Sequence, residues 1–265
     1  MEYLLIYMGI GALAGVFAGL LGVGGGAVTV PLLLWVFAVQ GISAEIATHM
    51  ALATSLAAMI VTSMSSALAH SAKNAVLWNI FPFLAGGVIL GSVFGVVTAV
   101  QISGAILQIA FGCFLTYVAL QTIIGFSAKA SRSIPGKPGL VGAGSVIGCV
   151  SMYFGIGGGS LTVPFLSYCG VPPGKAVGTS AALGLPIALW GTLLYIFNGW
   201  QNTLMPEYSL GFVYGPAAAG IVLTSPFFAK LGALTAHRLK PDHLRKVFGL
   251  VLMVIAVELL WNNLV

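Results

Sequence analysis

The chain consists of long apolar stretches separated by short polar or glycine-rich breaks. Three of the stretches run almost without interruption over residues 46–68, 78–100 and 104–126. A run of about twenty apolar residues is long enough for a helix to cross the hydrocarbon layer of a membrane. Barrel strands would instead alternate polar and apolar residues over about ten positions, and no such period is visible. The pattern predicts an all-α, polytopic membrane protein.

The positions of the breaks predict ten apolar segments, five in each half. The expected segments lie at about residues 3–21, 27–40, 45–69, 78–99 and 104–126, and then at about 139–154, 160–169, 174–197, 209–231 and 245–264. Between the two sets lies the only polar, Pro- and Ser-rich linker of the chain. We therefore expect a first transmembrane repeat at 1–126, a cytoplasmic linker at 127–138 and a second transmembrane repeat at 139–265.

The two halves share sequence motifs in the same order. The stretch from Gly22 to Pro31, GVGGGAVTVP, recurs 133 residues later as GIGGGSLTVP, with seven of ten positions identical. Further matches are Ala53-Thr54-Ser55 with Gly178-Thr179-Ser180, and Phe111-Gly112 with Phe248-Gly249. A collinear series of matches indicates an internal duplication.

The basic residues decide whether each glycine cluster is the tip of a hairpin or a break within one tilted helix. If the clusters are hairpin tips, all ten lysines and arginines fall on one side of the membrane, whereas helix breaks would split them four to six. Because cytoplasmic loops carry an excess of Lys and Arg, hairpins are favoured. The ten residues are Lys73, Lys129, Arg132, Lys137, Lys175, Lys230, Arg238, Lys240, Arg245 and Lys246.

With hairpins, each half crosses the bilayer an odd number of times, so the second half starts on the opposite side from the first. We therefore expect an inverted repeat in the inner (cytoplasmic) membrane, with the basic loops cytoplasmic. Both termini, Glu45 and Glu207 are then outside. Many secondary transporters use such repeats and bind their substrate between them.

Composition excludes a soluble fold. Hydrophobic residues make up 59% of the 265 residues and charged residues only 6%, whereas about a quarter of a soluble domain is charged. The net charge is +5, and the basic residues lie in short loops between the spans, so membrane topology explains them. No nucleic-acid partner is expected, and the protein is expected to be surrounded by membrane lipid. The start of the chain lacks the basic region of a secretory signal, and the first apolar run is expected to be a retained helix.

The glycine clusters are the first candidate for a binding site. Gly24, Gly25 and Gly26, and likewise Gly157, Gly158 and Gly159, free backbone N–H and C=O groups from the helical ladder, and such groups need partners inside a membrane. A helix begins directly after each cluster, and helix N-termini attract anions. Close helix packing by small residues is the alternative explanation.

Hydroxyl side chains that recur at matching places of the two halves complete the candidate substrate-binding set. Its members are Thr29, Thr54 and Ser55 in the first half, and Thr162, Thr179 and Ser180 in the second. Hydroxyls in membrane helices also bond to their own carbonyls, which is the alternative. His49 is the one histidine well inside an apolar run, and it is a candidate for proton coupling or for a plain helix contact. The three cysteines are expected to be packing residues, and neither catalytic residues, a metal site nor a cofactor is predicted.

At these motifs the chain resembles the TauE/SafE family, the sulfite exporters also described as toluene sulfonate uptake permeases. The duplicated Gly-x-Gly-Gly-Gly-x-x-Thr-Val-Pro, the later Ala-Thr-Ser and Gly-Thr-Ser segments, and a basic loop before the final Phe248-Gly249 helix carry the likeness. The resemblance implies transport of a sulfur-containing anion such as sulfite, a sulfonate or sulfoacetate, in the direction of export, with a coupling proton or sodium ion. The segment before Ala53 differs from that before Gly178, so the halves need not contribute equally.

Three function classes compete. Alternating access, with a small anion held between the two hairpins, is the leading hypothesis. A channel-like or partner-dependent permease subunit for another small anion is the second. A membrane-embedded enzyme is the third, and it would need convergent catalytic side chains that the spans do not supply. A homodimer is left open.

Overall fold

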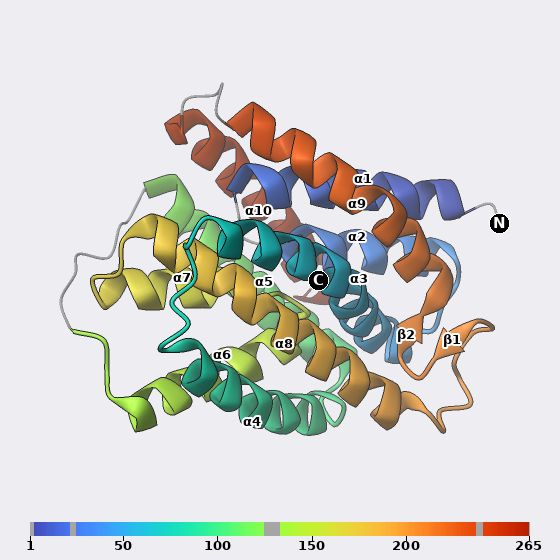
Figure 1. The fold of residues 1–265 in the computed structure, drawn as a ribbon. Coiled ribbons are helices and arrows are strands. Elements are labelled where there is room, and N and C mark those ends of the chain that lie inside the picture. Colours follow the sequence, from blue (N-terminus) through green and yellow to red (C-terminus); the bar gives the residue numbers. More distant parts are fainter. Residues whose placement is uncertain (1–2, 22–24, 125–132, 237–240, 265) are drawn as a thin grey trace.

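A computed structural model describes residues 3–21, 25–124, 133–236 and 241–264. Within these ranges the chain forms ten α-helices and one short β-hairpin (Figure 1). The first half contains α1 (Leu4–Leu21), α2 (Gly26–Val39), α3 (Ala44–Ala72), α4 (Phe81–Ala99) and α5 (Gly104–Ile124). The second half contains α6 (Lys137–Phe154), α7 (Gly159–Tyr168), α8 (Pro173–Gly199), β1 (Ser209–Leu210), β2 (Val213–Tyr214), α9 (Gly215–Ala236) and α10 (Pro241–Leu264).

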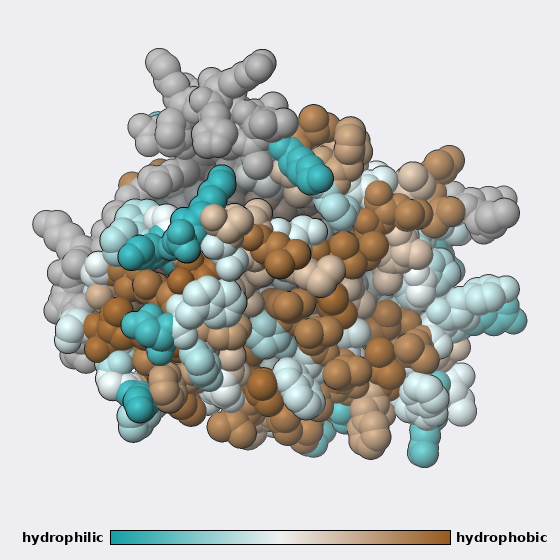
Figure 2. Space-filling model, in the orientation of Figure 1, coloured by the Kyte–Doolittle hydropathy of each residue, from teal (hydrophilic) through white to brown (hydrophobic). Residues whose placement is uncertain are grey.

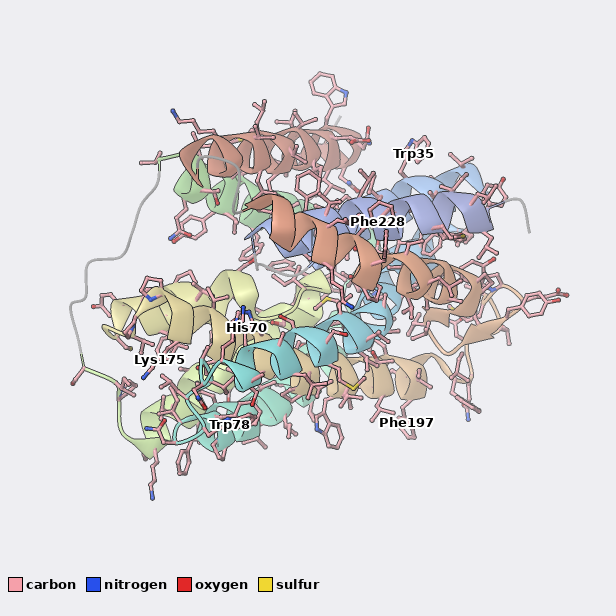
Figure 3. All side chains as sticks on the ribbon, turned by 45° about the horizontal axis from the view of Figure 1, so that its top comes forward. Trp35, His70, Trp78, Lys175, Phe197 and Phe228 are labelled. Carbon is pink, nitrogen blue, oxygen red and sulfur yellow. The ribbon has the colours of Figure 1, made fainter. Side chains whose placement is uncertain are left out.

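Five of the helices are long and apolar enough to cross a membrane. They are α3, α4, α5, α8 and the part of α10 from Lys246 to Leu264, and shorter apolar helices occupy Leu4–Gly19 and Gly26–Val39. Apolar side chains also cover much of the visible surface (Figure 2), and Trp78 and Phe197 lie at the outside of the bundle (Figure 3). The all-α, polytopic membrane fold predicted from the sequence is confirmed.

Glycines allow α4 and α6 to pack with their backbones in contact. A Cβ atom at Gly87, Gly91 or Gly95 of α4 would overlap the backbone of α6, and one at Gly144 or Gly148 of α6 would overlap that of α4. Small residues four apart form the usual close interface between membrane helices. Gly11 and Gly15 allow α1 to pack equally closely against α9. In Figure 1, α1 runs beside α9, and α4 runs beside α6.

The main helix pairs each join one half to the other. The first helix of each half packs on the fourth helix of the other half, α1 on α9 and α6 on α4, while α3 packs on α8 and α5 on α10. The contact residues give the directions: Gly11 meets Ile221 and Gly15 meets Ser225, so α1 and α9 run parallel. Gly184 meets Ser63 and Gly191 meets Leu56, so α3 and α8 run antiparallel.

These directions bear on the role of the glycine clusters. Had each cluster been a break within one crossing, each half would cross four times and α3 and α8 would run in the same direction. They do not, and α1 and α2 indeed form a hairpin: Gln40 donates to the Tyr7 hydroxyl at 2.7 Å, and Gly25 lies against Ala14. The inverted repeat stays a prediction, and these directions support it.

The two hairpin tips differ in how much of them the structure describes. In the second half, α6 ends at Phe154, the next residue, Gly155, has a φ of 59° that suits glycine, and α7 begins at Gly159. In the first half, α1 ends at Leu21 and α2 begins at Gly26. Gly24, one of the candidate residues, lies outside the described residues.

The prediction of one apolar helical segment over residues 209–231 was wrong at its start. Residues 209–214 form a β-hairpin, in which Leu210 pairs with Val213, and the helix begins only at Gly215. The two-residue turn places Gly211 at a φ of 55°, against the backbone of Ile196. A glycine at such a turn is a hairpin signal, but here it is embedded in an apolar run that suggests a span.

The ends of the helices separate charge along the bundle. Lys73 follows α3 and Lys175 lies in the first turn of α8, and these ends meet because Gly178 packs against Ala75. Glu45 lies in the first turn of α3, at the other end of the bundle. Figure 3 shows Lys175 and His70 toward one end and Phe197, at the far end of α8, toward the other.

Charge separation predicts the outcome of accessibility labelling. In a variant without Cys113, Cys149 and Cys169, single cysteines at Lys73 and Lys175 should react with a membrane-impermeant thiol reagent from the same side, and one at Glu45 from the opposite side. Mass spectrometry of intact cells and inverted vesicles measures this. Labelling of the two lysine positions from different sides would contradict the hairpin topology.

Glycine packing predicts a stability difference within one helix. Gly91→Leu should destabilise the protein by about 1–3 kcal/mol or more, because the side chain would overlap the α6 backbone. Gly86→Leu, on the same helix with open space around it, is the control and should change stability by less than about 0.5 kcal/mol. Thermal unfolding in detergent compares the two, and equal melting temperatures would show that the glycine contact is not needed.

Candidate functional site

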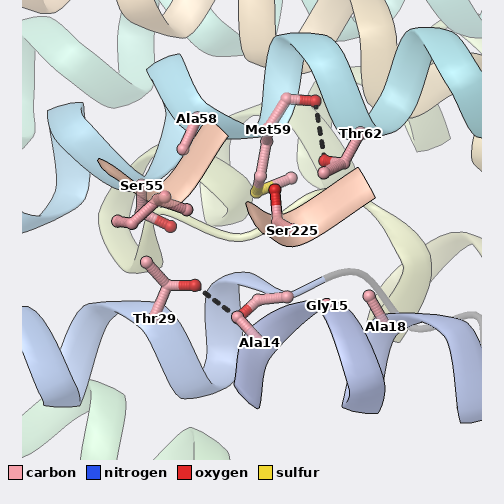
Figure 4. A pocket seen from close by; sticks show the side chains of 11 residues that line it. Ala14, Gly15, Ala18, Thr29, Ser55, Ala58, Met59, Thr62 and Ser225 are labelled. Atoms are coloured by element: carbon pink, nitrogen blue, oxygen red, sulfur yellow. Dashed lines mark hydrogen bonds between the residues drawn. The ribbon is translucent and has the colours of Figure 1, made fainter. Parts of the chain in front are cut away.

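A small cavity lies where the first hairpin tip meets α3 and α9 (Figure 4). Its walls come from α1, from the start of α2, from α3 and from α9, and include Ala14, Gly15, Gly25, Ala58 and Met59. The hydroxyls of Thr29, Ser55, Thr62 and Ser225 add the polar groups. Its inner volume is only about 20 Å³, which is room for about one water molecule, so the cavity is narrow in this conformation.

Three of the four hydroxyls already donate hydrogen bonds. Thr29 Oγ1 donates to the carbonyl of Gly25 at 2.9 Å, and Thr62 Oγ1 to that of Met59 at 3.1 Å. Ser55 Oγ donates to the carbonyl of Gly155 at 2.9 Å, which connects α3 to the second glycine cluster. Each hydroxyl can use its lone pairs as acceptors, but none has a second proton to give.

Ser225 is the exception. Its side chain is 2% exposed, and its Oγ has no hydrogen-bond partner among the described residues. A buried hydroxyl without a partner costs free energy and needs an explanation. Because Ser225 lines the cavity, its hydroxyl is a candidate donor to a bound solute.

Sequence reasoning missed Ser225 because it looked for residues shared by the two halves. Counted from the shared Phe111-Gly112 and Phe248-Gly249, the matching residue of the first half is Val88. The packing agrees, since Gly15 meets Ser225 where Gly148 meets Val88. A hydroxyl beside Pro226, in the middle of an apolar run, was the one available signal.

The electrostatics of the cavity come from the backbone. No charged side chain of the described residues lines it. Gly25 is the N-cap of α2 and faces the cavity, and the first N–H groups of a helix lack partners within that helix. The positive end of the α2 dipole therefore acts at this place.

Thr54 and Thr179 lie outside the wall of this cavity and accept hydrogen bonds from backbone amides of the other half. Thr54 Oγ1 accepts the backbone N–H of Tyr214 at 3.0 Å, and Thr179 Oγ1 accepts that of Leu77 at 2.9 Å. Each threonine thus holds the chain that leads into the fourth helix of the other half. Neither lines the cavity, and Ser180 is buried but does not line it either.

The corresponding place in the second half is filled by larger side chains. A Cβ atom at Gly158 would meet Ile187 Cδ1 at 2.7 Å and Ile147 Cγ2 at 3.2 Å. The matching residues of the first half are Thr62 and Ala14, which line the cavity. Thr162, fully buried with its Oγ1 unpartnered among the described residues, lies beside Gly158 in this filled region.

The glycines of the clusters divide between packing and lining. Gly26 packs against the carbonyl of Gly155 and the Cα of Ile156, and Gly157 lies against the end of Met59. The Gly159 amide donates to the carbonyl of Gly157, so it is engaged locally. Of the five candidate glycines that the structure describes, only Gly25 lines the cavity.

His49 lies away from the cavity. Its Nε2 is 3.1 Å from the carbonyl of Ala99, and because a carbonyl only accepts, this nitrogen carries a proton. The ring also lies 5.4 Å from that of Phe212. This is the geometry of a helix contact, and proton coupling through His49 stays a prediction. Over the ranges that the structure describes, no three His, Cys, Asp or Glu residues gather as metal ligands.

Fold and relatives together define the class, a polytopic α-helical membrane transporter. The chain belongs to the sulfite exporter TauE/SafE family, whose model matches residues 7–259. A relative in Haemophilus influenzae is 34% identical over 97% of this chain and 98% of its own length. A relative in Xylella fastidiosa is 30% identical over 99% of this chain and 97% of its own length. YunE of Bacillus subtilis is 27% identical over 96% of each of the two chains. All three are named probable membrane transporter proteins. No solved structure matches the chain significantly.

The free hydroxyl predicts a separable effect on binding. Ser225→Ala should leave the melting temperature unchanged or raise it, because it removes an unpartnered buried group. Affinity for an anion should fall about tenfold or more, since a hydrogen bond to a charged group contributes about 1.5–3 kcal/mol. Ser65→Ala, exposed on α3, is the control. Isothermal titration with sulfite and sulfoacetate measures the affinity, and equal affinities in the two variants would remove Ser225 from the site.

Proposed function

We propose that this protein is a secondary transporter that exports a small sulfur-containing anion, of the sulfite, sulfonate or sulfoacetate type, by alternating access. The observation that carries the proposal is the unpartnered hydroxyl of Ser225, buried in a cavity at the N-terminus of α2. The class of transporter follows from the family, and the sulfur chemistry is taken from the description of that family.

An anion suits this cavity because the groups available to a solute are donors. Ser225 can give its hydroxyl proton, and the start of α2 offers backbone N–H groups and a positive dipole end. The oxygens of sulfite or a sulfonate accept such bonds. Without a Lys or Arg in the cavity wall, binding is moderate and the anion can leave again, as a carrier requires.

Alternating access needs rigid units that move and contacts that break. The glycine-packed pairs α1 with α9 and α4 with α6 are the candidates for rigid units, because their backbones interlock. The contact between the hairpin tips, Gly26 on Gly155 and Ser55 on the Gly155 carbonyl, is the candidate for the part that opens. In this scheme, opening of that contact widens the narrow cavity.

Orientation and coupling complete the proposal. We place the protein in the cytoplasmic membrane, with the ends that carry Lys73 and Lys175 inside and both termini outside, by the positive-inside rule. Coupling to a proton or a sodium ion drives export. His49→Gln would abolish the pH dependence of transport if that histidine carries the proton.

Transport by purified protein tests the proposal. In proteoliposomes, sulfite or sulfoacetate should move down its gradient with saturation, and an outward gradient of unlabelled anion should drive counterflow of labelled anion, because only a carrier exchanges one solute for another. Gly25→Leu, which fills the cavity wall, should stop the flux. Flux without saturation or counterflow would indicate a channel, and flux only with a co-purifying soluble protein would indicate a partner-dependent subunit.

A further inference from the structure

Met59 lies between the two hairpin tips. It is on α3, one turn after Ser55, it is 5% exposed, and it forms part of the cavity wall. Figure 4 shows its side chain beside Ser225, with Thr29 across the cavity. Met59 is therefore next to the groups that the proposed function assigns to the anion.

The end of the Met59 side chain touches both glycine clusters. Its Sδ is 3.3 Å from the position that a Cβ atom would take at Gly26, and its Cε is 2.3 Å from the corresponding position at Gly157. The thioether thus fills the space that a side chain at residue 157 would need, and it lies in contact distance of Gly26. It separates the cavity at the first tip from the backbone of the second tip.

The duplicated half has no such side chain. Counted from the shared Thr54-Ser55 and Thr179-Ser180, the residue that matches Met59 is Gly184. A Cβ atom there would meet Ser63 Oγ at 2.8 Å. The fold therefore tolerates a glycine at this place in one half and carries a long flexible side chain in the other.

We infer that Met59 is a plug beside the two glycine tips, and that its withdrawal extends the cavity toward Gly157 and sets the largest anion that the protein accepts. The inference rests on the proposed function, whose site it completes. A methionine suits this task because its side chain is unbranched, has three rotatable bonds and fills irregular gaps without a fixed shape.

Selectivity for the size of the anion distinguishes a plug from an ordinary core residue, because only removal of a plug should favour larger anions. Purified wild-type protein, Met59→Ala and Met59→Leu are compared for transport of sulfite, sulfoacetate and toluenesulfonate in proteoliposomes. Met59→Ala should raise the rate for toluenesulfonate relative to sulfite at least about tenfold, since even one methylene of pocket volume changes discrimination by that much. Met59→Leu, of similar volume, should keep the wild-type ratio.

Met50→Ala is the matched control. Met50 is on the same helix, is fully buried and does not line the cavity, so its truncation costs packing without opening the site. An unchanged ratio in Met59→Ala, or an equal increase in Met50→Ala, would overturn the plug.

A binding measurement keeps this test independent of transport. If the wild-type protein moves none of the three anions, the proposed function fails, and thermal unfolding then decides about the plug alone. Toluenesulfonate should raise the melting temperature of Met59→Ala more than that of the wild type, because a ligand stabilises the folded state that binds it. Equal shifts would overturn the inference while leaving any measured transport of sulfite in place.

Discussion

Inside a membrane every backbone N–H and C=O group must find a partner within the protein, and this constraint governs both glycine clusters. Each cluster interrupts its helix, so the freed groups have to be buried against other parts of the chain. The structure buries them against each other and against α3: Gly26 packs on Gly155, and Ser55 donates to the Gly155 carbonyl. The place where the freed backbone of the two clusters gathers is thus also the place where the two halves of the chain touch.

Two equivalent hydrogen bonds outside the glycine clusters also connect the two halves. Thr54 accepts the amide of Tyr214, and Thr179 accepts that of Leu77, so each half fixes the entrance of the fourth helix of the other. Those fourth helices are the ones that pack by glycine contact on α1 and α6. Any motion of α1 with α9 is therefore linked through Thr54 to α3, which forms one wall of the cavity. Residues that occur in both halves of a duplicated chain can therefore be shared because they hold the two halves together, without contacting a ligand.

This distinction explains what the sequence could and could not predict. Apolar runs and glycine clusters predicted the helices to within a few residues, because span length and helix-breaking residues are local properties. The β-hairpin at 209–214 escaped, since its turn residue, Gly211, lies in an apolar run and its conformation depends on contact with Ile196. Among the candidate hydroxyls, Thr29 and Ser55 line the cavity. The place of Ser225 in its wall depends on the packing of α9 on α1, a contact between opposite ends of the chain.

The two tips are filled unequally, so they are not equivalent as places for a solute. A symmetric pair of sites would offer a solute two equivalent places and no reason to occupy either first. Here the small residues Ala14 and Thr62 leave space in the first half, while Ile147 and Ile187 occupy the matching space in the second. Close-packed side chains resist displacement. The second tip is therefore expected to be the more rigid of the two, and the first tip to have room for side chains to move. Met59 of the first half and Ser225 of the second both lie at the first tip, and both lack a counterpart of their own type, which is what divergence of the first tip toward binding and of the second tip toward support would produce.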